Sequence, residues 1–354
     1  SEVEPCMYSK IDTNGNRLVI AVYVDDLVVG HNDPILFAKF RARFLGQFRA
    51  KHLGPLSWFL GIAVDQDSKG AYHLNQTKYI CDMVTRFLQA NGRHSVSREV
   101  PITKSLASKL RTAQTEEERA QARKLPYLQL VGSLLYLAVM TRPDIMASMS
   151  LLCKYMSDPT EECFEAALNV LLYVSGTKDL KLSFVNKLKH KAVFYDLSDS
   201  IDRNTGLHSY SDSSWGNPYP LHGYVVFLNG GPIAYSSRLL KIVADSSAEA
   251  EYAACSLCAK ELVFIRELCR DMGFEVYGPI VMAVDNTAAI DIAQDVGVTK
   301  RNKHFERALH YIRREVSMLR AKLFYVPTDL QVGDIFTKIL DNRTHLTHRK
   351  YIFG

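Results

Sequence analysis

The chain has 354 residues, of which 47% are hydrophobic and 23% are charged. This composition is that of an ordinary globular protein and excludes a collagen-like repeat or a disordered chain. At about 150 residues per domain, the length predicts two or three domains. The net charge of +5 is unevenly placed, because residues 300–322 contain eight basic and two acidic side chains and leave the rest of the chain slightly negative.

Neither a membrane span nor a secretory signal is expected. The longest predominantly apolar run, Leu130–Met140, has 11 residues, whereas a helix that crosses a bilayer needs about 18 or more. The chain opens with Ser-Glu-Val-Glu-Pro, which lacks the features of a signal peptide, and it looks cut from a longer sequence. Seven cysteines spread thinly over the chain are typical of reduced, buried thiols. These features predict an intracellular protein of the cytoplasm or nucleus with no membrane partner.

The first hundred residues alternate between strand and helix patterns. Residues 17–30 are two β-branched apolar runs joined by Asp25 and Asp26, which predicts a β-hairpin with both acids at its turn. Apolar residues with helical spacing follow over residues 34–50. We further expect a strand over Trp58–Val64 and a helix over Tyr79–Leu88.

A charged stretch without aromatic residues covers Thr103–Lys124, a composition typical of a linker or an exposed helix. After it, Leu128–Val139 and Phe164–Val174 have the apolar character of buried helices. The charged stretch therefore marks a predicted subdomain boundary.

A different pattern begins near residue 207. Three short strands are expected at Leu207–Asp212, Gly223–Leu228 and Pro232–Ser236, the last two joined by the hairpin signal Asn229-Gly230-Gly231. We then expect a helix over Ser247–Met272, a strand over Ile280–Val284, a helix over Asn286–Ala293, a strand over Lys322–Val326 and a helix over Val332–Ile339. Three antiparallel strands followed by alternating helices and strands predict a mixed α/β layer.

The basic segment is also predicted to be helical, because apolar residues recur every three or four positions at Phe305, Leu309, Ile312, Val316 and Leu319. Lys303, Arg307 and Arg314 lie opposite this stripe. Two interpretations are open: a solvated helix face, which is the commoner case, or a surface that holds nucleic-acid phosphates without sequence preference.

Four acids in the C-terminal half lie in strands or at element ends: Asp212, Glu249, Asp285 and Asp334. Three of them could instead be helix caps or first-turn acids that only stabilise a helix. Glu249, for example, fits a capping box with Ser246. Asp212 has the weakest alternative, because aspartate is depleted in strands. Together the four would surround one strand end, where their repulsion requires divalent cations. Paired Mg²⁺ ions in such a cluster are the arrangement that cleaves phosphodiesters.

Several motifs occur in one order along the chain: Tyr23-Val24-Asp25-Asp26, Trp58-Phe59-Leu60-Gly61-Ile62, Val131-Gly132-Ser133-Leu134-Leu135-Tyr136-Leu137, Thr141-Arg142-Pro143-Asp144-Ile145, Ser246-Ser247-Ala248-Glu249-Ala250-Glu251-Tyr252, Val284-Asp285-Asn286 and Asp334-Ile335-Phe336-Thr337-Lys338. Together they resemble the polyprotein of copia-type (Ty1/copia) LTR retrotransposons over nearly the whole chain. The resemblance implies a partial reverse-transcriptase palm and thumb (1–102), a linker (103–125), a connection-like helical region (126–204) and a ribonuclease H-like mixed-sheet domain (205–354).

The resemblance also implies the ribonuclease H site. Its four metal-binding acids fall on Asp212, Glu249, Asp285 and Asp334, with two Mg²⁺ ions, or Mn²⁺ in their place, as cofactors and an RNA–DNA hybrid as substrate. This sequence departs from the family pattern at Ser214, where a second acid is usual, and at Ala248, where threonine is usual. The loop before Asp334 lacks the histidine of many ribonucleases H, and His304 and His310 lie upstream instead.

For the polymerase the resemblance implies an incomplete site. Asp25 and Asp26 would bind metal beside a template-primer duplex, but the family's third aspartate comes from an earlier palm strand. The only acids before the hairpin are Glu2, Glu4 and Asp12, and none lies in a matching motif. We therefore expect polymerase activity to be lost in this chain.

Smaller signals each carry two interpretations. Cys255-x-x-Cys258 has no second ligand pair at zinc spacing and predicts core thiols. Trp215 and Tyr210 would either stack on a nucleic acid or belong to the core, and Leu60-Gly61 either matches the family's hairpin near the primer or is a close-packed strand glycine.

The function predicted first is a ribonuclease H attached to a truncated reverse transcriptase. The alternatives are a non-catalytic nucleic-acid-binding or decayed element product, and a reverse transcriptase that is active only when the missing palm strands are supplied. The sequence makes no prediction of oligomeric state.

Overall fold

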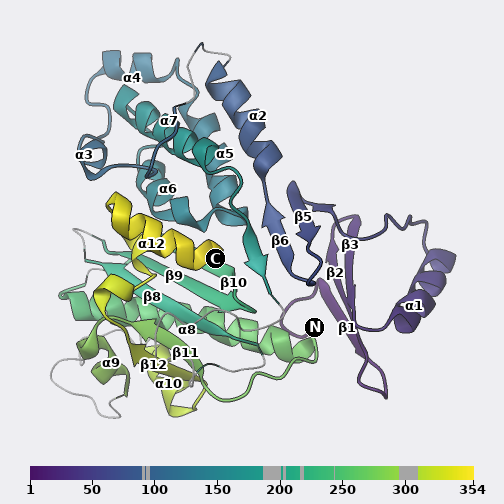
Figure 1. Ribbon diagram of the computed structural model, residues 1–354. Coiled ribbons are helices and arrows are strands. Elements are labelled where there is room, and N and C mark those ends of the chain that lie inside the picture. Colours follow the sequence, from purple (N-terminus) through teal and green to yellow (C-terminus); the bar gives the residue numbers. More distant parts are fainter. Residues whose placement is uncertain are drawn as a thin grey trace. The chain divides into compact units, whose positions relative to one another are not determined.

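The computed structural model describes residues 1–354 except 90, 91, 93–95, 186–200, 202–204, 216–218, 243 and 295–309 (Figure 1). The chain divides into two compact units. The first combines Ser1–Ser57 with Lys260–Gly278, and the second combines Trp58–Ala259 with Pro279–Gly354. Among the described helices, none has the length and apolar character that a membrane crossing requires.

The first unit is built on an antiparallel sheet of β1 (Met7–Ile11), β2 (Arg17–Tyr23) and β3 (Asp26–His31), in that order. Tyr23 pairs with Asp26, so the predicted hairpin is confirmed, with Val24 and Asp25 forming its two-residue turn. Val24 has a φ of 50°, a left-handed conformation that such a turn requires. The last turns of the long helix α8 (Ser247–Asp271) also belong to this unit, where Ser1 Oγ donates to Asp271 Oδ2 at 2.6 Å.

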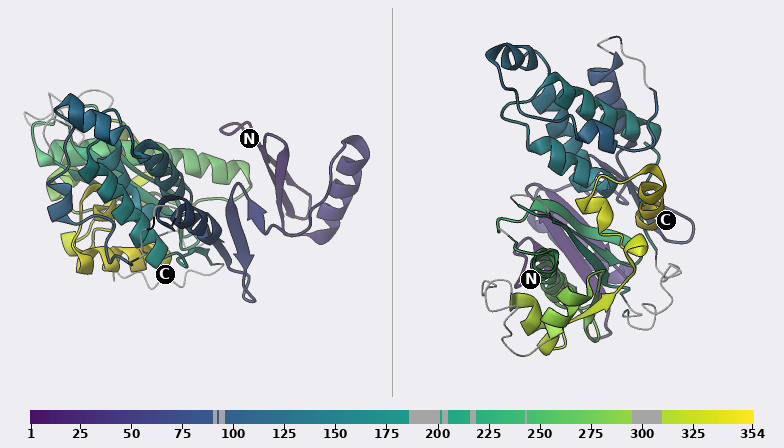
Figure 2. Two further views of the ribbon diagram at one scale, coloured as in Figure 1. Left: turned by 90° about the horizontal axis from the view of Figure 1, so that it is seen from above. Right: turned by 90° about the vertical axis from the view of Figure 1, so that its left-hand side faces the viewer.

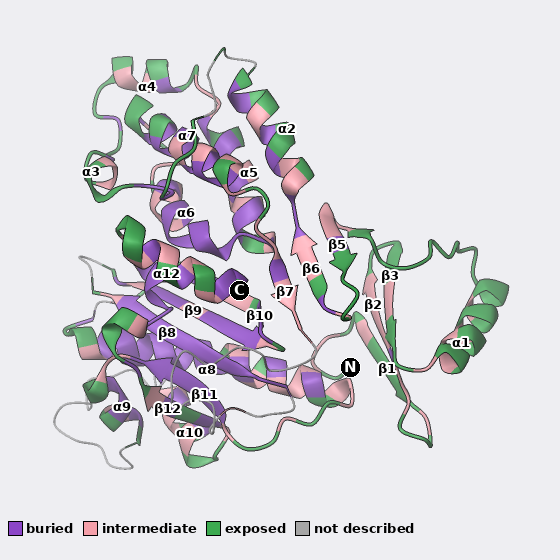
Figure 3. Ribbon diagram, viewed as in Figure 1, coloured by how far each residue is buried: buried purple, intermediate pink, exposed green. Residues whose placement is uncertain are grey.

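The helix predicted over 34–50 is α1 (Pro34–Gln47), which Asp33 caps by accepting the N–H of Ile35 at 2.9 Å. None of its residues is buried, as the green helix in Figure 3 shows. Its phenylalanines contact one another instead, with the rings of Phe44 and Phe48 4.7 Å apart.

The second unit begins with a sheet of β4 (Trp58–Phe59), β5 (Ile62–Gln66), β6 (Tyr72–Asn75) and β7 (Leu182–Phe184). The single strand predicted over Trp58–Val64 is wrong, because Leu60 and Gly61 turn the chain with φ values of 48° and 74°. These residues make the two-residue hairpin turn between β4 and β5. Tyr136 Oη donates to the carbonyl of Leu60 at 2.5 Å and fixes the turn against a helix.

A helical layer follows. It contains α2 (Thr77–Phe87), α5 (Tyr127–Met140), the 3₁₀ turn η2 (Pro143–Ile145), α6 (Met146–Cys153) and α7 (Glu161–Gly176). The helices predicted over Tyr79–Leu88, Leu128–Val139 and Phe164–Val174 are confirmed, and the last two carry the core, with Leu130, Leu134 and Leu171 fully buried. A buried ion pair closes this layer: Arg142 Nη2 lies 2.8 Å from Asp144 Oδ2, which also accepts from Tyr173 Oη.

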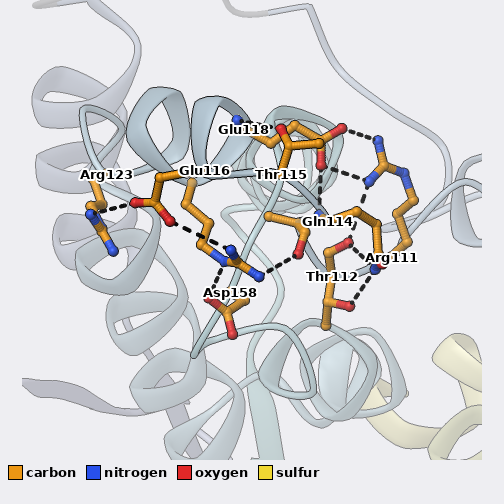
Figure 4. A network of polar contacts seen from close by, with 10 residues as sticks. Arg111, Thr112, Gln114, Thr115, Glu116, Glu118, Arg123 and Asp158 are labelled. Atoms are coloured by element: carbon orange, nitrogen blue, oxygen red, sulfur yellow. Dashed lines mark hydrogen bonds and ion pairs between the residues drawn. The ribbon is translucent and has the colours of Figure 1, made fainter.

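The charged stretch Thr103–Lys124 is a packed part of this layer. It contains α3 (Lys104–Ala107) and α4 (Glu116–Ala122), and polar contacts connect its parts (Figure 4). Arg111 donates to Glu118 at 2.9 Å, while Arg119 Nε lies 3.3 Å from Asp158 Oδ1. The domain boundaries on either side of it remain predictions.

The C-terminal half contains a five-stranded sheet in the order β10-β9-β8-β11-β12. Its strands are β8 (His208–Ser214), β9 (Leu221–Leu228), β10 (Gly231–Leu239), β11 (Ile280–Val284) and β12 (Ala321–Tyr325). The pairs β8–β9 and β9–β10 are antiparallel, whereas β8–β11 and β11–β12 are parallel. The predicted mixed α/β layer is therefore confirmed, and Asn229 and Gly230 make the hairpin turn with φ values of 48° and 78°.

Helices cover both faces of this sheet, and Figure 2 shows α8 and α12 on opposite sides of it. The helices are α8 (Ser247–Asp271), α9 (Thr287–Gln294), α10 (Tyr311–Ser317), α11 (Asp334–Thr337) and α12 (Asn342–Phe353), with the 3₁₀ turn η4 (Thr328–Leu330) before α11. Cys255 and Cys258 on α8 are fully buried thiols outside any disulfide, as predicted. Helix α12 was not predicted. Of the predicted basic helix, α10 lies in the described part, whereas Lys303, His304 and Arg307 lie outside it.

Candidate active site

Three carboxylates meet at one edge of the five-stranded sheet. Asp212 lies on β8, and Asp285 directly follows β11. Because these two neighbouring strands are parallel, their carboxyl ends meet at the same edge. Asp334 opens α11, which packs on β8 and β9. One carboxylate oxygen of each residue lies within 4.8 Å of the other two, so the structure brings together three of the four predicted ligands.

Two glycines allow α11 to approach the sheet so closely. Gly223 pairs with Asp212 across the β8–β9 ladder, and a Cβ atom there would lie 2.9 Å from Thr337 Cγ2. A Cβ atom on Gly333 would lie 2.8 Å from Asp212 Cβ. Real Cβ atoms do not come this close to other carbons, so larger residues at either position would push Asp334 away from Asp212.

Gln331 holds the loop before α11 against β8. Its side chain is fully buried, donates to the carbonyl of Ser211 at 3.0 Å and accepts from the N–H of Gly333 at 3.0 Å. The loop is thereby fixed at the residues that flank both Asp212 and Asp334.

One cation of the chain already lies among the acids. Lys338, one turn after Asp334 on the same face, places Nζ 2.7 Å from Asp334 Oδ1 and 3.4 Å from Asp212 Oδ1. Thr337 Oγ1 donates a hydrogen bond to Asp212 Oδ2. Burial raises the pKa of Asp212, and Lys338 and Thr337 oppose this shift. Burial and the charge of Asp212 raise the pKa of Asp334 to about 7.

Asp285 does not serve as the cap that its position allows. The N-terminus of α9 is capped by the next residue, because Asn286 Oδ1 accepts the N–H of Ala289 at 3.0 Å. Asn286 is therefore the cap of α9, and the Asp285 carboxylate lies with Asp212 and Asp334.

Glu249 makes hydrogen bonds at the N-terminus of α8 that resemble a capping box. Its Oε2 accepts the backbone N–H of Asp245 at 2.8 Å, and its own N–H donates to Ser246 Oγ at 3.2 Å. The bond to Ser246 is the one a capping box makes, whereas the side chain of Glu249 reaches the residue before Ser246 and not Ser246 itself. The structure does not bring Glu249 into the group of Asp212, Asp285 and Asp334.

Glu251, two residues further along α8, faces that group. It is buried, and burial together with the charges of Asp212 and Asp285 raises its pKa to about 10. Its Oε2 has no hydrogen-bond partner among the described residues. A buried carboxyl with an unsatisfied oxygen beside two other acids is costly unless it has a cationic partner.

The sequence did contain a signal for Glu251. Along α8 it lies at helical spacing from Cys255, Cys258 and Leu262, all of them buried, so an acid occupies the apolar face of the helix. Such a position is expensive for a charge and typical of a functional group. The resemblance to the family pointed to Glu249 of the same motif, and the assignment to either glutamate stays a prediction.

The remaining predicted site residues lie elsewhere. Asp25 and Asp26 are exposed at the β2–β3 turn, and within the described ranges no group of three or more potential metal ligands includes them. Arg314 is engaged within α10, where its Nε lies 3.1 Å from Glu315 Oε1 and its guanidinium lies over the ring of Tyr311. His310 Nδ1 lies 3.1 Å from Tyr252 Oη, and burial lowers its pKa.

Known proteins are similar in sequence to this chain over most of its length. Residues 1–103 match the reverse transcriptase (RNA-dependent DNA polymerase) family. The chain is 29% identical over 347 residues to the retrovirus-related Pol polyprotein from transposon TNT 1-94 of Nicotiana tabacum, covering 95% of this chain and 24% of that protein. It is 31% identical over 324 residues to the polyprotein from transposon RE1 of Arabidopsis thaliana, covering 90% and 20%. The chain thus spans a quarter or less of these relatives' length.

Among solved structures, RNase H1 from the halophilic archaeon Halobacterium salinarum NRC-1 is similar to part of this chain. The similarity covers 37% of this chain and 93% of that one, at 18% identity and a TM-score of 0.26.

Proposed function

Because this chain belongs to the Pol polyproteins of copia-type retrotransposons, we propose that its C-terminal half is a ribonuclease H that cleaves the RNA strand of RNA–DNA hybrids. The observation that carries the proposal is the convergence of Asp212, Asp285 and Asp334 within 4.8 Å. We assign the fourth acid of the site to Glu251 in place of the predicted Glu249. The strand order of the sheet and the positions of the acids at its edge support the same assignment.

The side chains at this edge fit a site for divalent cations. All four acids offer oxygen atoms, which Mg²⁺ and Mn²⁺ prefer, and Glu251 has an oxygen without a partner in the described part of the chain. Two such ions would activate water and stabilise the leaving 3′ oxygen. Asp212 would be one of the four residues that hold them. Thr337 would orient its carboxylate, and Lys338 would balance part of the negative charge.

The test is cleavage of a labelled RNA–DNA hybrid in Mg²⁺ and in EDTA, combined with calorimetric titration of Mg²⁺ and Mn²⁺ into the full chain. Asp285→Asn should abolish both cleavage and metal binding, because a neutral amide is a poor ligand for a hard cation. Cleavage that persists in this variant would remove Asp285 from the site.

Two matched substitutions separate the glutamates. Glu251→Gln should weaken metal binding and cleavage, and it should stabilise the metal-free protein at neutral pH, because the amide folds into this place without the proton uptake that a carboxyl with a pKa raised to about 10 requires. Glu249→Gln keeps a capping-box residue and should change none of these quantities. The reverse pattern would restore the original assignment to Glu249.

For the polymerase half we propose that the chain alone extends no primer. The match of residues 1–103 to reverse transcriptases supports a template-primer partner, but Asp25 and Asp26 lack a third acid among the described residues. Template-dependent incorporation of nucleotides by the purified chain would contradict this. We also propose that Lys303, Arg307 and Arg314 contact nucleic acid. The domain boundaries at residues 102, 125 and 204 and a location in the cytoplasm or nucleus are proposals as well.

A further inference from the structure

Trp215 lies close in sequence to Asp212 of the acidic cluster, with most of its side chain in solvent. It directly follows β8, three residues after Asp212, and is 64% exposed. Its indole Nε1 donates to the carbonyl of Ala244 at 3.1 Å. Tyr210 on the same strand is fully buried, so the two aromatic residues that the sequence could not distinguish have different environments.

The hydrogen bond fixes the ring between the two elements that carry the site. Ala244 belongs to the segment that leads into α8, the helix of Glu251, whereas Trp215 continues the strand of Asp212. With its N–H anchored to Ala244, the indole still leaves most of the residue exposed. Burying such a side chain would stabilise the protein by about 25 cal/mol for each Å² removed from water, so an exposed but anchored indole suits contact with a ligand.

The shape and chemistry of the proposed substrate match this surface. Hybrids with RNA have a wide, shallow minor groove that displays sugars and 2′-hydroxyls. A flat aromatic ring packs on a sugar or base face whatever the sequence, and such contacts typically contribute a factor of about 5 to 100 in binding. A non-ionic contact of this kind also avoids adding another charge beside four acids.

We propose that Trp215 contacts the substrate, its exposed indole packing against a sugar of the RNA–DNA hybrid beside the bond to be cleaved. This inference rests on the proposed ribonuclease H function and adds a residue outside the metal site. The contact positions the hybrid and does not take part in the chemistry, so it affects binding and leaves the chemical step unchanged.

The chain offers an internal control, because it has two tryptophans and Trp58, 50% exposed, lies on β4. In the full chain carrying Trp58→Phe, Trp215 is the single indole. Its fluorescence should change saturably when an RNA–DNA hybrid is added in EDTA, where the metal-dependent reaction cannot run. The Trp215→Phe chain, which retains Trp58, should show no such change.

Binding and kinetics give the second measurement. Trp215→Ala should weaken binding of a dye-labelled hybrid by roughly tenfold and raise KM similarly, with kcat within about twofold, whereas Trp58→Ala should change neither. Unchanged Trp215 emission at a hybrid concentration that saturates the labelled-hybrid signal would overturn the proposal, as would equal affinities of the two alanine variants. A Trp58→Phe chain that binds hybrid through Trp215 but does not cleave would contradict the ribonuclease activity alone. If that chain neither binds nor cleaves, both proposals fail.

Discussion

Replacing the buried His222 should make the protein less sensitive to acid. His222 lies on β9, next to Ser213 of β8 on one side and Arg238 of β10 on the other. Burial, assisted by the charge of Arg238, lowers its pKa from 6.5 to about 4. Its Nδ1 has no hydrogen-bond partner among the described residues, so the neutral ring is held in the sheet mainly by packing.

The sign and size of the effect follow from the two pKa values. Between pH 6.5 and pH 4 the unfolded state binds a proton that the native state does not, so this histidine destabilises the fold as the pH falls through that window. At pH 5 the unfolded histidine is almost fully protonated and the native one about one-tenth protonated. This histidine therefore lowers the free energy of unfolding by about 2 kcal/mol at pH 5 relative to pH 8. With an unfolding entropy of about 2.1 cal/mol/K per residue over 354 residues, this corresponds to roughly 3 °C.

The assay is thermal unfolding of wild type and His222→Phe in EDTA between pH 5 and pH 8. Phenylalanine retains an aromatic ring and removes the titrating group, so the variant should gain about 2 kcal/mol on wild type as the pH is lowered from 8 to 5. His222→Gln should show the same gain, even if its stability at pH 8 differs. A difference between wild type and either variant that does not change with pH would refute the reasoning.

Two further changes test the packing of the fold. Gly333→Ala should cost about 1–3 kcal/mol and weaken metal binding measured by calorimetry, because the added methyl overlaps Asp212; Gly132→Ala on α5, where a Cβ meets nothing within 4 Å, should be neutral or stabilising. Arg142→Ala should cost about 3–5 kcal/mol in chemical unfolding, because it leaves a buried aspartate without its cation. The exposed Arg111 pairs with a glutamate on the surface, and its replacement by alanine should cost less than about 1 kcal/mol.

Elements with a complete local signal were predictable from the sequence. Asn229-Gly230 specifies its hairpin because both residues adopt positive φ readily, and β11 begins and ends where its apolar run does. The turn at Leu60-Gly61 was missed because β4 has only two residues, too few to show alternation. Helix α12 was missed because its buried residues include His345 and His348. Because histidine is polar, the sequence of this helix shows no continuous apolar face, although the side chains are buried in the fold.

The candidate site was predictable as a set of acids and less so as a set of contacts. Asp212 was conspicuous because a charge inside a strand has few structural explanations. The choice between Asp285 and Asn286 as the cap of α9, and between Glu249 and Glu251 as the inward-facing acid, depends on where α8 and α9 meet the sheet. Sequence spacing decides neither choice, because both candidates of each pair lie in the same short motif. Only the tertiary packing distinguishes them.

The electrostatics of the cluster explain why its geometry is held so tightly. Like charges in a buried place separate unless the backbone prevents it, and here close packing at Gly223 and Gly333 together with the buried Gln331 removes the room to separate. Lys338 offsets part of the charge from within the chain, but a single ammonium cannot balance Asp212, Asp285, Asp334 and Glu251 together. This excess of carboxyls over cations at one edge supports the proposal that further cations bind there. The raised pKa values of Glu251 and Asp334 have the same origin, because burial beside like charges favours the protonated, neutral carboxyl.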